Sequence, residues 1–214
     1  MDEEIIFFHR FIIASMLYNS FMREYIPNDI VTIPKDAKRV FEGKIFNVYQ
    51  WPQQLFDGTT ETFEMLSRHD TVIIIAIKDG KIVITRQKQP GKDWFYDFPG
   101  GRNNHPEENE LAAAKREMLE ETGMEFRSWR LVEVHQPFAK IDWLVYTFLA
   151  TDFVSKGQQD LDGGELIEVE EVDFARIKEL CDSGKLYTGG SWAKECDSLE
   201  ALEKLPSLHD YESE

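Results

Sequence analysis

Short β-forming runs and tight turns dominate the chain from residue 40 to residue 86. Runs rich in β-branched and aromatic side chains span 40–41, 45–51 and 60–65, and Asp57-Gly58 between the last two is typical of a hairpin turn. A continuous apolar run at 71–77 predicts a buried strand, which Asp79-Gly80 joins to a further strand at 81–86. The segment therefore predicts two successive β-hairpins.

A helical period follows, with Pro106 and Asn109 as start signals and Gly123 as a stop signal. Apolar positions 111, 114 and 118, closed by 112 and 119, predict one buried face. Glu117, Glu120 and Glu121 fall on the other side within about 100° of arc. Like charges at this spacing destabilise a helix, and a cation bound between them would reverse that effect. A solvated acidic helix face is the alternative interpretation.

The remaining pattern alternates strands with helices. We expect an aromatic strand at 92–98, strands at 129–134, 143–150 and 166–174, a polar loop at 155–165, and helices at 174–181 and 191–205. Strands between helices predict an α/β/α layered domain with a mixed sheet.

Composition limits the possible partners and compartment. Lys and Arg total 24 while Asp and Glu total 40, and the formal charge of −16 argues against a nucleic-acid or anionic-membrane partner. The two cysteines, Cys181 and Cys196, form no zinc pattern and suggest a reduced, cytoplasmic setting. A small phosphorylated ligand stays compatible with the charge, because a bound metal inverts the local field.

The first 37 residues form an extension that we expect to be helical or poorly ordered. Their apolar run is too short and interrupted to cross a bilayer, and the acidic start does not fit a secretory signal. A natural start at Met22 is an alternative hypothesis for this segment.

The stretch around the helix resembles the signature of the Nudix hydrolase superfamily. Residues 116–124 match every specified position of its Arg-Glu-apolar-any-Glu-Glu-any-Gly-apolar block, and seven residues separate Glu108 from Arg116 as the signature requires. Six residues rather than five separate Gly101 from Glu108, which indicates a one-residue insertion in the loop. The superfamily implies a mixed sheet between helices.

The segment Val40 to Phe46 resembles the small antiparallel dimerisation domain that precedes the Nudix core in ADP-ribose pyrophosphatases. We therefore expect a β segment at 38–68, a Nudix domain at 69–205 and an acidic, solvated tail at 206–214. The branch implies a homodimer. One departure is that Pro137 lies fourteen residues after Gly123, where these relatives have a proline about sixteen residues after.

The resemblance assigns roles to the helix and the preceding loop. Glu117, Glu120 and Glu121, with the carbonyl of Gly100, are implied as ligands of Mg²⁺, with Mn²⁺ as the alternative ion. Arg116 is implied as an orienting residue paired with Glu108. The expected catalytic residues are Arg116, Glu108 and Glu120, together with a general base.

The general base and the substrate contacts are less closely specified. Glu165 is the candidate base, with Glu168 and Asp162 as competitors and a plain surface role as the alternative. The expected substrate contacts are Trp51, which would stack on the nucleobase, with Arg86, Lys88 and Gly101. Relatives often carry a phosphate-binding or ribose-binding arginine where this chain has Gln89, which would leave that role to Arg86 or Lys88.

The implied activity is Mg²⁺-dependent hydrolysis of a nucleoside diphosphate sugar, foremost ADP-ribose to AMP and ribose 5-phosphate. Another nucleoside diphosphate sugar is the nearest alternative, because Gln89 and Pro137 depart from the branch. A catalytically silent nucleotide-binding module is the alternative from another class. A decapping role fits poorly with the acidic chain.

Overall fold

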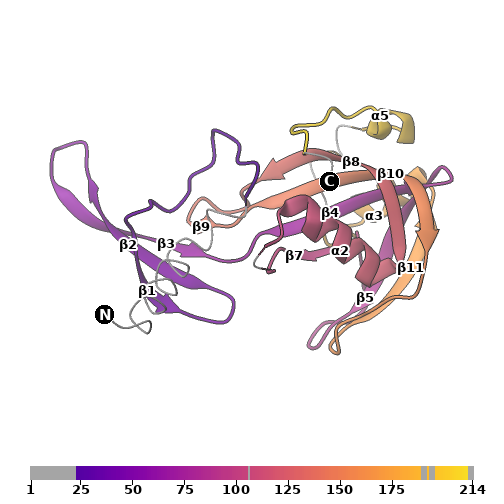
Figure 1. The fold of residues 1–214 in the computed structure, drawn as a ribbon, viewed down its shortest axis with the longest axis horizontal. Helices are drawn as coiled ribbons and strands as arrows, with labels where there is room; N and C mark the ends of the chain where they lie inside the picture. Colours follow the sequence, from indigo (N-terminus) through magenta and orange to yellow (C-terminus); the bar gives the residue numbers. More distant parts are fainter. Residues whose placement is uncertain (1–22, 106, 189–191, 193–195, 212–214) are drawn as a thin grey trace, which may run out of the picture.

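The computed structural model describes residues 23–105, 107–188, 192 and 196–211 (Figure 1). Two sheets and three helices make up the described fold. The smaller sheet has the order β1-β2-β3-β9, and the larger has β11-β5-β4-β10-β8, with β6 paired to β5 and β7 to β4. The elements are β1 (Lys38–Glu42), β2 (Asn47–Gln54), β3 (Thr60–Ser67), β4 (Thr71–Lys78), β5 (Lys81–Lys88), β6 (Phe95–Asp97), β7 (Gly100–Arg102), α2 (Glu110–Thr122), β8 (Met124–His135), β9 (Ile141–Asp142), β10 (Val145–Lys156), β11 (Leu166–Val172), α3 (Phe174–Asp182) and α5 (Leu199–Glu203).

The larger sheet is mixed and is covered on both faces, which confirms the predicted α/β/α layers. Strands β4 and β10 run parallel, whereas β5, β8 and β11 pair antiparallel with their neighbours. Successive side chains of a strand point to opposite faces. Accordingly Ile73, Ile75 and Ile77 of β4 pack with α3 and α5, while Val72 and Ile74 pack with α2.

Helix α2 begins and ends where the sequence predicts. The Asn109 side chain accepts a hydrogen bond from the Ala112 N–H at 2.8 Å, and Gly123 closes the helix in the left-handed region at φ 70°. A Cβ on Gly123 would lie 2.5 Å from the Gly157 carbonyl oxygen, so the next loop can approach only a glycine. The predicted buried face needs one correction: Ala113 is buried, whereas Leu119 is 44% exposed.

Both predicted β-hairpins are present, one in each sheet. β2 and β3 pair antiparallel around Asp57-Gly58, and β4 and β5 pair antiparallel around Asp79-Gly80. The small sheet projects from one end of the larger body (Figure 1). Every residue of β1 is exposed, so this sheet presents a long uncovered surface in the single chain.

A buried ion triad fastens the segment before β1 to the junction of the two sheets. The Arg23 guanidinium donates two hydrogen bonds to Asp70, at 2.6 and 2.8 Å, and one to Asp142 at 2.6 Å. Asp142 also accepts a hydrogen bond from the Ile33 N–H at 3.0 Å. Residues 23–37 contain no helix, and the hypotheses on residues 1–22 concern residues outside the described ranges.

The described part of the C-terminal tail packs on the body rather than extending into solvent. The Leu208 N–H donates to the Leu131 carbonyl at 2.8 Å, and Tyr211 contacts Phe148 with ring centroids 5.7 Å apart. The predicted helix at 191–205 is shorter than expected. Its described part is α5, which starts after Ser198, while 189–191 and 193–195 lie outside the description.

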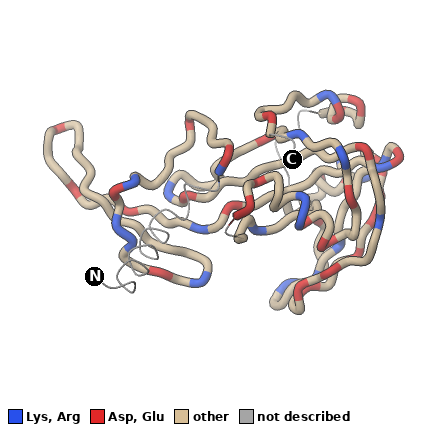
Figure 2. The backbone as a smooth tube through the Cα atoms, in the orientation of Figure 1, with Lys and Arg blue, Asp and Glu red and all other residues tan. Residues whose placement is uncertain are grey.

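Acidic residues are spread along the length of the molecule, over the small sheet as well as the body (Figure 2). In the part of the chain that the structure describes, no helix is long and apolar enough to cross a membrane.

Candidate active site

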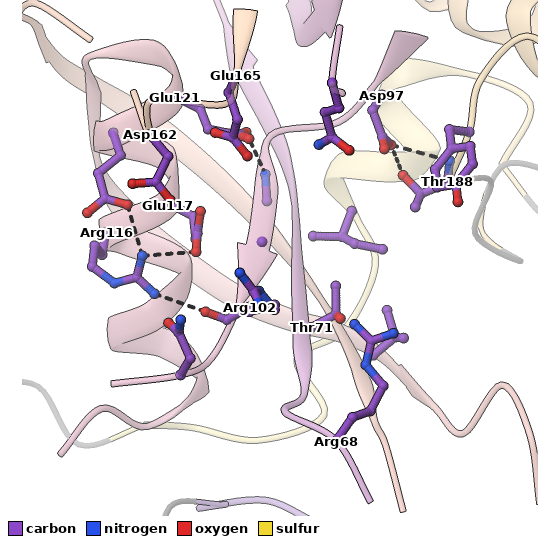
Figure 3. Close-up of a pocket in the computed structure, with 18 of the residues that line it drawn as sticks. Arg68, Thr71, Asp97, Arg102, Arg116, Glu117, Glu121, Asp162, Glu165 and Thr188 are labelled. Carbon is purple, nitrogen blue, oxygen red and sulfur yellow. Dashed lines mark hydrogen bonds and ion pairs between the residues drawn. The ribbon is translucent and has the colours of Figure 1, made fainter. Parts of the chain in front are cut away.

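A cavity of about 1040 Å³ lies between α2, β7, the loop before β11 and the junction of the two sheets. Its walls include the predicted glycine loop and the carboxylates of α2 (Figure 3). Seven of the predicted site residues line it: Gly100, Gly101, Arg116, Glu117, Glu120, Glu121 and Glu165.

Arg116 organises the carboxylates on the cavity side of α2. Its Nη1 donates to Glu117 and to Glu120, both at 2.9 Å. Its Nε donates to Glu108 at 3.0 and 3.1 Å, which confirms the predicted pairing. Nη2 donates to the Arg102 carbonyl at 3.1 Å. One guanidinium thereby ties the glycine loop, residue 108 and the acidic helix face together.

The glycine loop approaches the helix so closely that side chains are excluded. A Cβ on Gly101 would lie 2.4–2.5 Å from the carboxylate of Glu117. The Gly100 N–H donates to Glu121 at 2.9 Å, and a Cβ on Gly100 would meet the Val72 carbonyl oxygen at 2.2 Å. Gly100 also has φ +155°, at the limit of the region that favours glycine.

Burial and mutual repulsion raise the proton affinity of Glu117 and Glu121. Burial raises the pKa of Glu117 to about 7, Arg116 partly opposes this, and Glu120 and Glu165 add to it. Burial raises the pKa of Glu121 well above its ordinary range, and the charges of Glu117 and Glu165 raise it further.

Glu165 faces the helix from the loop before β11. Hydrogen bonds anchor this loop to the end of α2: the Gly157 N–H donates to the Gly123 carbonyl at 2.7 Å, and the Asp160 N–H donates to the Glu120 carbonyl at 2.9 Å. Burial and then the charge of Asp162 raise the pKa of Glu165. The loop thus places a carboxyl group with raised proton affinity beside the acidic helix face.

The two other candidates for the general base, Asp162 and Glu168, lie in different places. Asp162 also lines the cavity, whereas Glu168 accepts a hydrogen bond from Arg86 at 2.9 Å on β11, away from the cavity wall.

A comparison with protein-family models matches residues 67–190 to the NUDIX domain, which is more than half of the chain. The chain belongs to the NUDIX family. It is a Nudix hydrolase, since the matched segment includes the acidic helix α2, whose carboxylates line the cavity. No curated protein sequence matches the chain.

Two solved structures share the fold. A protein described as an ADP compounds hydrolase aligns over 79% of this chain and 90% of its own, with a TM-score of 0.60 and 16% identity. A NUDIX hydrolase from Nitrosomonas europaea aligns over 67% of this chain and 97% of its own, with a TM-score of 0.52 and 23% identity. At these identities the likeness concerns the fold.

Nudix hydrolases generally use divalent metal ions, and the donor set here fits such an ion. The available atoms are carboxylate oxygens, which hard divalent cations prefer, and the charges of neighbouring carboxylates raise the pKa values of Glu117 and Glu121. Within the described ranges, no three acidic, His or Cys side chains already surround a common point. Glu117, Glu120 and Glu121 are the helix side chains that could hold such an ion.

Three predicted substrate contacts lie outside the cavity wall of the single chain. Trp51 lies on β2 and contacts Phe63, with ring centroids 6.3 Å apart. Arg86 lies over the ring of Trp94 and pairs with a carboxylate of β11, and Lys88 is exposed at the end of β5. Neither basic side chain is brought to the cavity that holds the carboxylates.

Sequence reasoning missed several residues of the opposite wall. Arg68, Asp97, Arg102, Trp143 and Tyr187 line the cavity. They come from separate places in the chain and form no motif. Their only sequence signal is position, since charged residues occur just before a buried strand and just after the glycine pair.

Asp97 is a second buried acid of this wall. It accepts hydrogen bonds from the Phe98 N–H at 2.9 Å and from the backbone and hydroxyl of Thr188. Burial raises its pKa to about 7, and Lys92 opposes the shift. Asp97 thereby holds the loop that carries Tyr187 and Thr188 against the cavity.

Proposed function

We propose that this Nudix hydrolase cleaves the pyrophosphate bond of a nucleoside diphosphate sugar in the presence of Mg²⁺, with ADP-ribose as the leading substrate. The observation that carries the proposal is the convergence of Glu117, Glu121 and Glu165 on one cavity beside the Gly100-Gly101 loop. The ADP compounds hydrolase among the structural neighbours supports an ADP-containing substrate at the level of the fold.

The reaction adds water across the bond between phosphorus and the bridging oxygen. In ADP-ribose a new P–O bond forms to the water oxygen, the bridging P–O bond breaks, and AMP and ribose 5-phosphate leave. A bound divalent cation supplies charge neutralisation for the phosphates.

The protein groups position the reactants. Glu165 accepts the proton of the attacking water, and burial, which raises the pKa of its carboxyl, makes it a stronger base. Arg116 fixes Glu117 and Glu120 relative to the glycine loop. Glu117, Glu120 and Glu121, with the Gly100 carbonyl, hold the cation.

The test is a hydrolysis panel with Mg²⁺ that includes ADP-ribose, ADP-glucose, GDP-mannose, UDP-glucose, NADH and a dinucleoside polyphosphate. We expect ADP-ribose to give the highest kcat/KM and Glu121→Gln to lower it at least about 100-fold, because the neutral side chain is a poorer cation ligand. Gly163→Ala is the matched control, because a Cβ there meets nothing within 4 Å. Preference for another compound would move the substrate assignment, and no turnover at all would support a nucleotide-binding module.

We also propose a cytoplasmic homodimer formed through the small sheet. Its uncovered surface carries large apolar side chains, including Val40 at 51%, Phe41 at 58% and Ile45 at 53% exposure. Exposed apolar patches of this kind mark interaction surfaces. A dimer of this type would also bring Trp51 of one chain toward the cavity of the other, as the nucleobase contact requires.

Light scattering at micromolar concentration tests the dimer, with Phe41→Ser expected to yield a monomer. A wild-type monomer would remove both the dimer and the role of Trp51 in the nucleoside pocket.

A further inference from the structure

Two arginines of the cavity wall have no carboxylate partner. Arg68 lies just after β3 and Arg102 ends β7, and no ion pair to either occurs in the described part of the chain. Arg68 Nε is buried without a hydrogen-bond partner there. Figure 3 shows Arg68 across the cavity from Glu117 and Glu121, with Arg102 between them in this view. A buried N–H without a partner, such as Nε of the half-buried Arg68, is costly, and an anion could accept a hydrogen bond from it.

Aromatic rings hold Arg68 in a defined position. Its guanidinium carbon lies 4.3 Å from the ring centroid of Trp143 and 5.8 Å from that of Phe46. Trp143 is itself fixed, because its Nε1 donates to the Thr71 hydroxyl at 3.0 Å. Stacking fixes the plane of a guanidinium and leaves its N–H edge free to bind an oxyanion.

The strand register brings the second arginine to the same place. Thr71 pairs with Arg102 in the β4–β7 ladder, and Arg68 precedes Thr71 by three residues. The Arg102 carbonyl accepts a hydrogen bond from Arg116, so the backbone of β7 joins the acidic helix to the arginine side of the cavity.

Arg68 and Arg102 lie close enough on this wall for the charge of one to act on the other. Burial lowers the pKa of Arg68, and the charge of Arg102 lowers it further. Burial and then Arg102 also lower the pKa of His69. The nearby charge of Asp70 opposes both shifts.

Arg116 cannot supply the missing charge for a substrate, because three carboxylates already surround it. Lys92, which also lines the cavity, lies 3.7 Å from the ring centroid of Tyr187 and acts on Asp97. Arg68 and Arg102 are therefore the guanidinium groups of the cavity wall that form no ion pair within the described residues.

We propose that Arg68 and Arg102 form the subsite for the substrate phosphate that lies on the side of the cavity away from α2. This role replaces the one that the sequence suggested for Arg86 and Lys88, which lie outside the cavity. The inference rests on the proposed hydrolysis of a nucleoside diphosphate, and its test is separable because phosphate binding requires no turnover.

The experiment titrates inorganic pyrophosphate with Mg²⁺ present into the full chain by calorimetry, and measures KM and kcat on the best substrate of the panel. We expect Arg68→Gln and Arg102→Gln each to weaken pyrophosphate binding about 10- to 100-fold, as for a lost charge-assisted hydrogen bond. KM should rise by a similar factor while kcat changes less than about threefold, because the carboxylates of α2 are untouched. Arg68→Lys should fall between wild type and Arg68→Gln, since it keeps the charge and loses the planar stack.

Arg176→Gln is the matched control, because Arg176 pairs with Glu179 at 2.7 Å on α3 and contacts the Tyr96 ring outside the cavity wall. It should bind pyrophosphate as the wild type does. The proposal is overturned if wild type does not bind pyrophosphate at millimolar concentration, or if both glutamine variants bind it unchanged. A fall in kcat with unchanged pyrophosphate affinity would likewise overturn it in favour of a structural role. Weakened pyrophosphate binding with no turnover of any panel compound would uphold this subsite and refute the proposed hydrolysis.

Discussion

Replacing Arg23 with methionine should destabilise the protein far more than a surface charge change. The side chain of Arg23 is 4% exposed, and those of Asp70 and Asp142 are 8% and 6% exposed. The substitution removes three hydrogen bonds and leaves two buried carboxylates without their cation. Breaking a buried ion pair in this way costs about 3–5 kcal/mol. For a chain of this size that corresponds to a fall in Tm of about 6–20 °C.

The assay is urea unfolding at pH 7 followed by tryptophan fluorescence, with Arg176→Met as the matched control. Arg176 belongs to an exposed ion pair with Glu179, for which a loss of at most about 1 kcal/mol is expected. Because Asp70 also accepts a hydrogen bond from the Leu144 N–H, beside Trp143, the variant should raise KM as well. If Arg23→Met costs no more than Arg176→Met, the triad does not fasten the segment and the reasoning is wrong.

Three further changes test other parts of the site. Gly101→Ala should abolish hydrolysis while circular dichroism shows a folded protein, because its Cβ would meet the Glu117 carboxylate at 2.4 Å; activity near wild type would contradict this close approach. The pKa of Asp97 is about 7 when folded and near 4 when unfolded, so the folded state binds the extra proton and the free energy of unfolding falls as pH rises between these values. The Asp97→Asn variant should lose this pH dependence, which amounts to at most about 1.4 kcal/mol of unfolding free energy per pH unit. Urea unfolding at several pH values with EDTA present measures it, and an unchanged pH dependence in the variant would refute the raised pKa of Asp97. Treatment with EDTA should abolish hydrolysis, and added Mg²⁺ should restore it. The Tm should also rise with the Mg²⁺ concentration, because the ion binds the folded state. Activity that persists in EDTA would contradict a metal-dependent site.

The pattern of apolar and polar residues predicted those strands and helices whose burial and end signals are set by residues close along the chain. The run at 71–77 is apolar throughout because both faces of β4 are covered, and it appears as a strand with its predicted hairpin. The ends of α2 follow from Asn109 and Gly123, whose backbone and side-chain preferences act within a few residues. The prediction was less accurate for α5, where the pattern suggested a longer helix than the described one.

The acidic half of the site was also readable from sequence, because its members share one helix and one adjacent loop. The separations of Glu117, Glu120 and Glu121 fix their positions on α2, and Arg116 reaches Glu108 as the family resemblance implied. The buried face of the helix was only partly predicted. Leu119 is exposed because the sheet contacts Ala113, Ala114 and Met118 instead.

The sequence by itself therefore determined the strand and helix order, the glycine loop and the acidic helix, since these depend on neighbours close along the chain. Only the tertiary structure decided the opposite wall of the cavity, which Arg68, Arg102 and Trp143 line from separate parts of the chain. It also separated Arg86 from that cavity and joined Arg23 to Asp70 and Asp142. The physical reason is that register and sheet packing set these contacts, and neither leaves a periodic signal in the sequence.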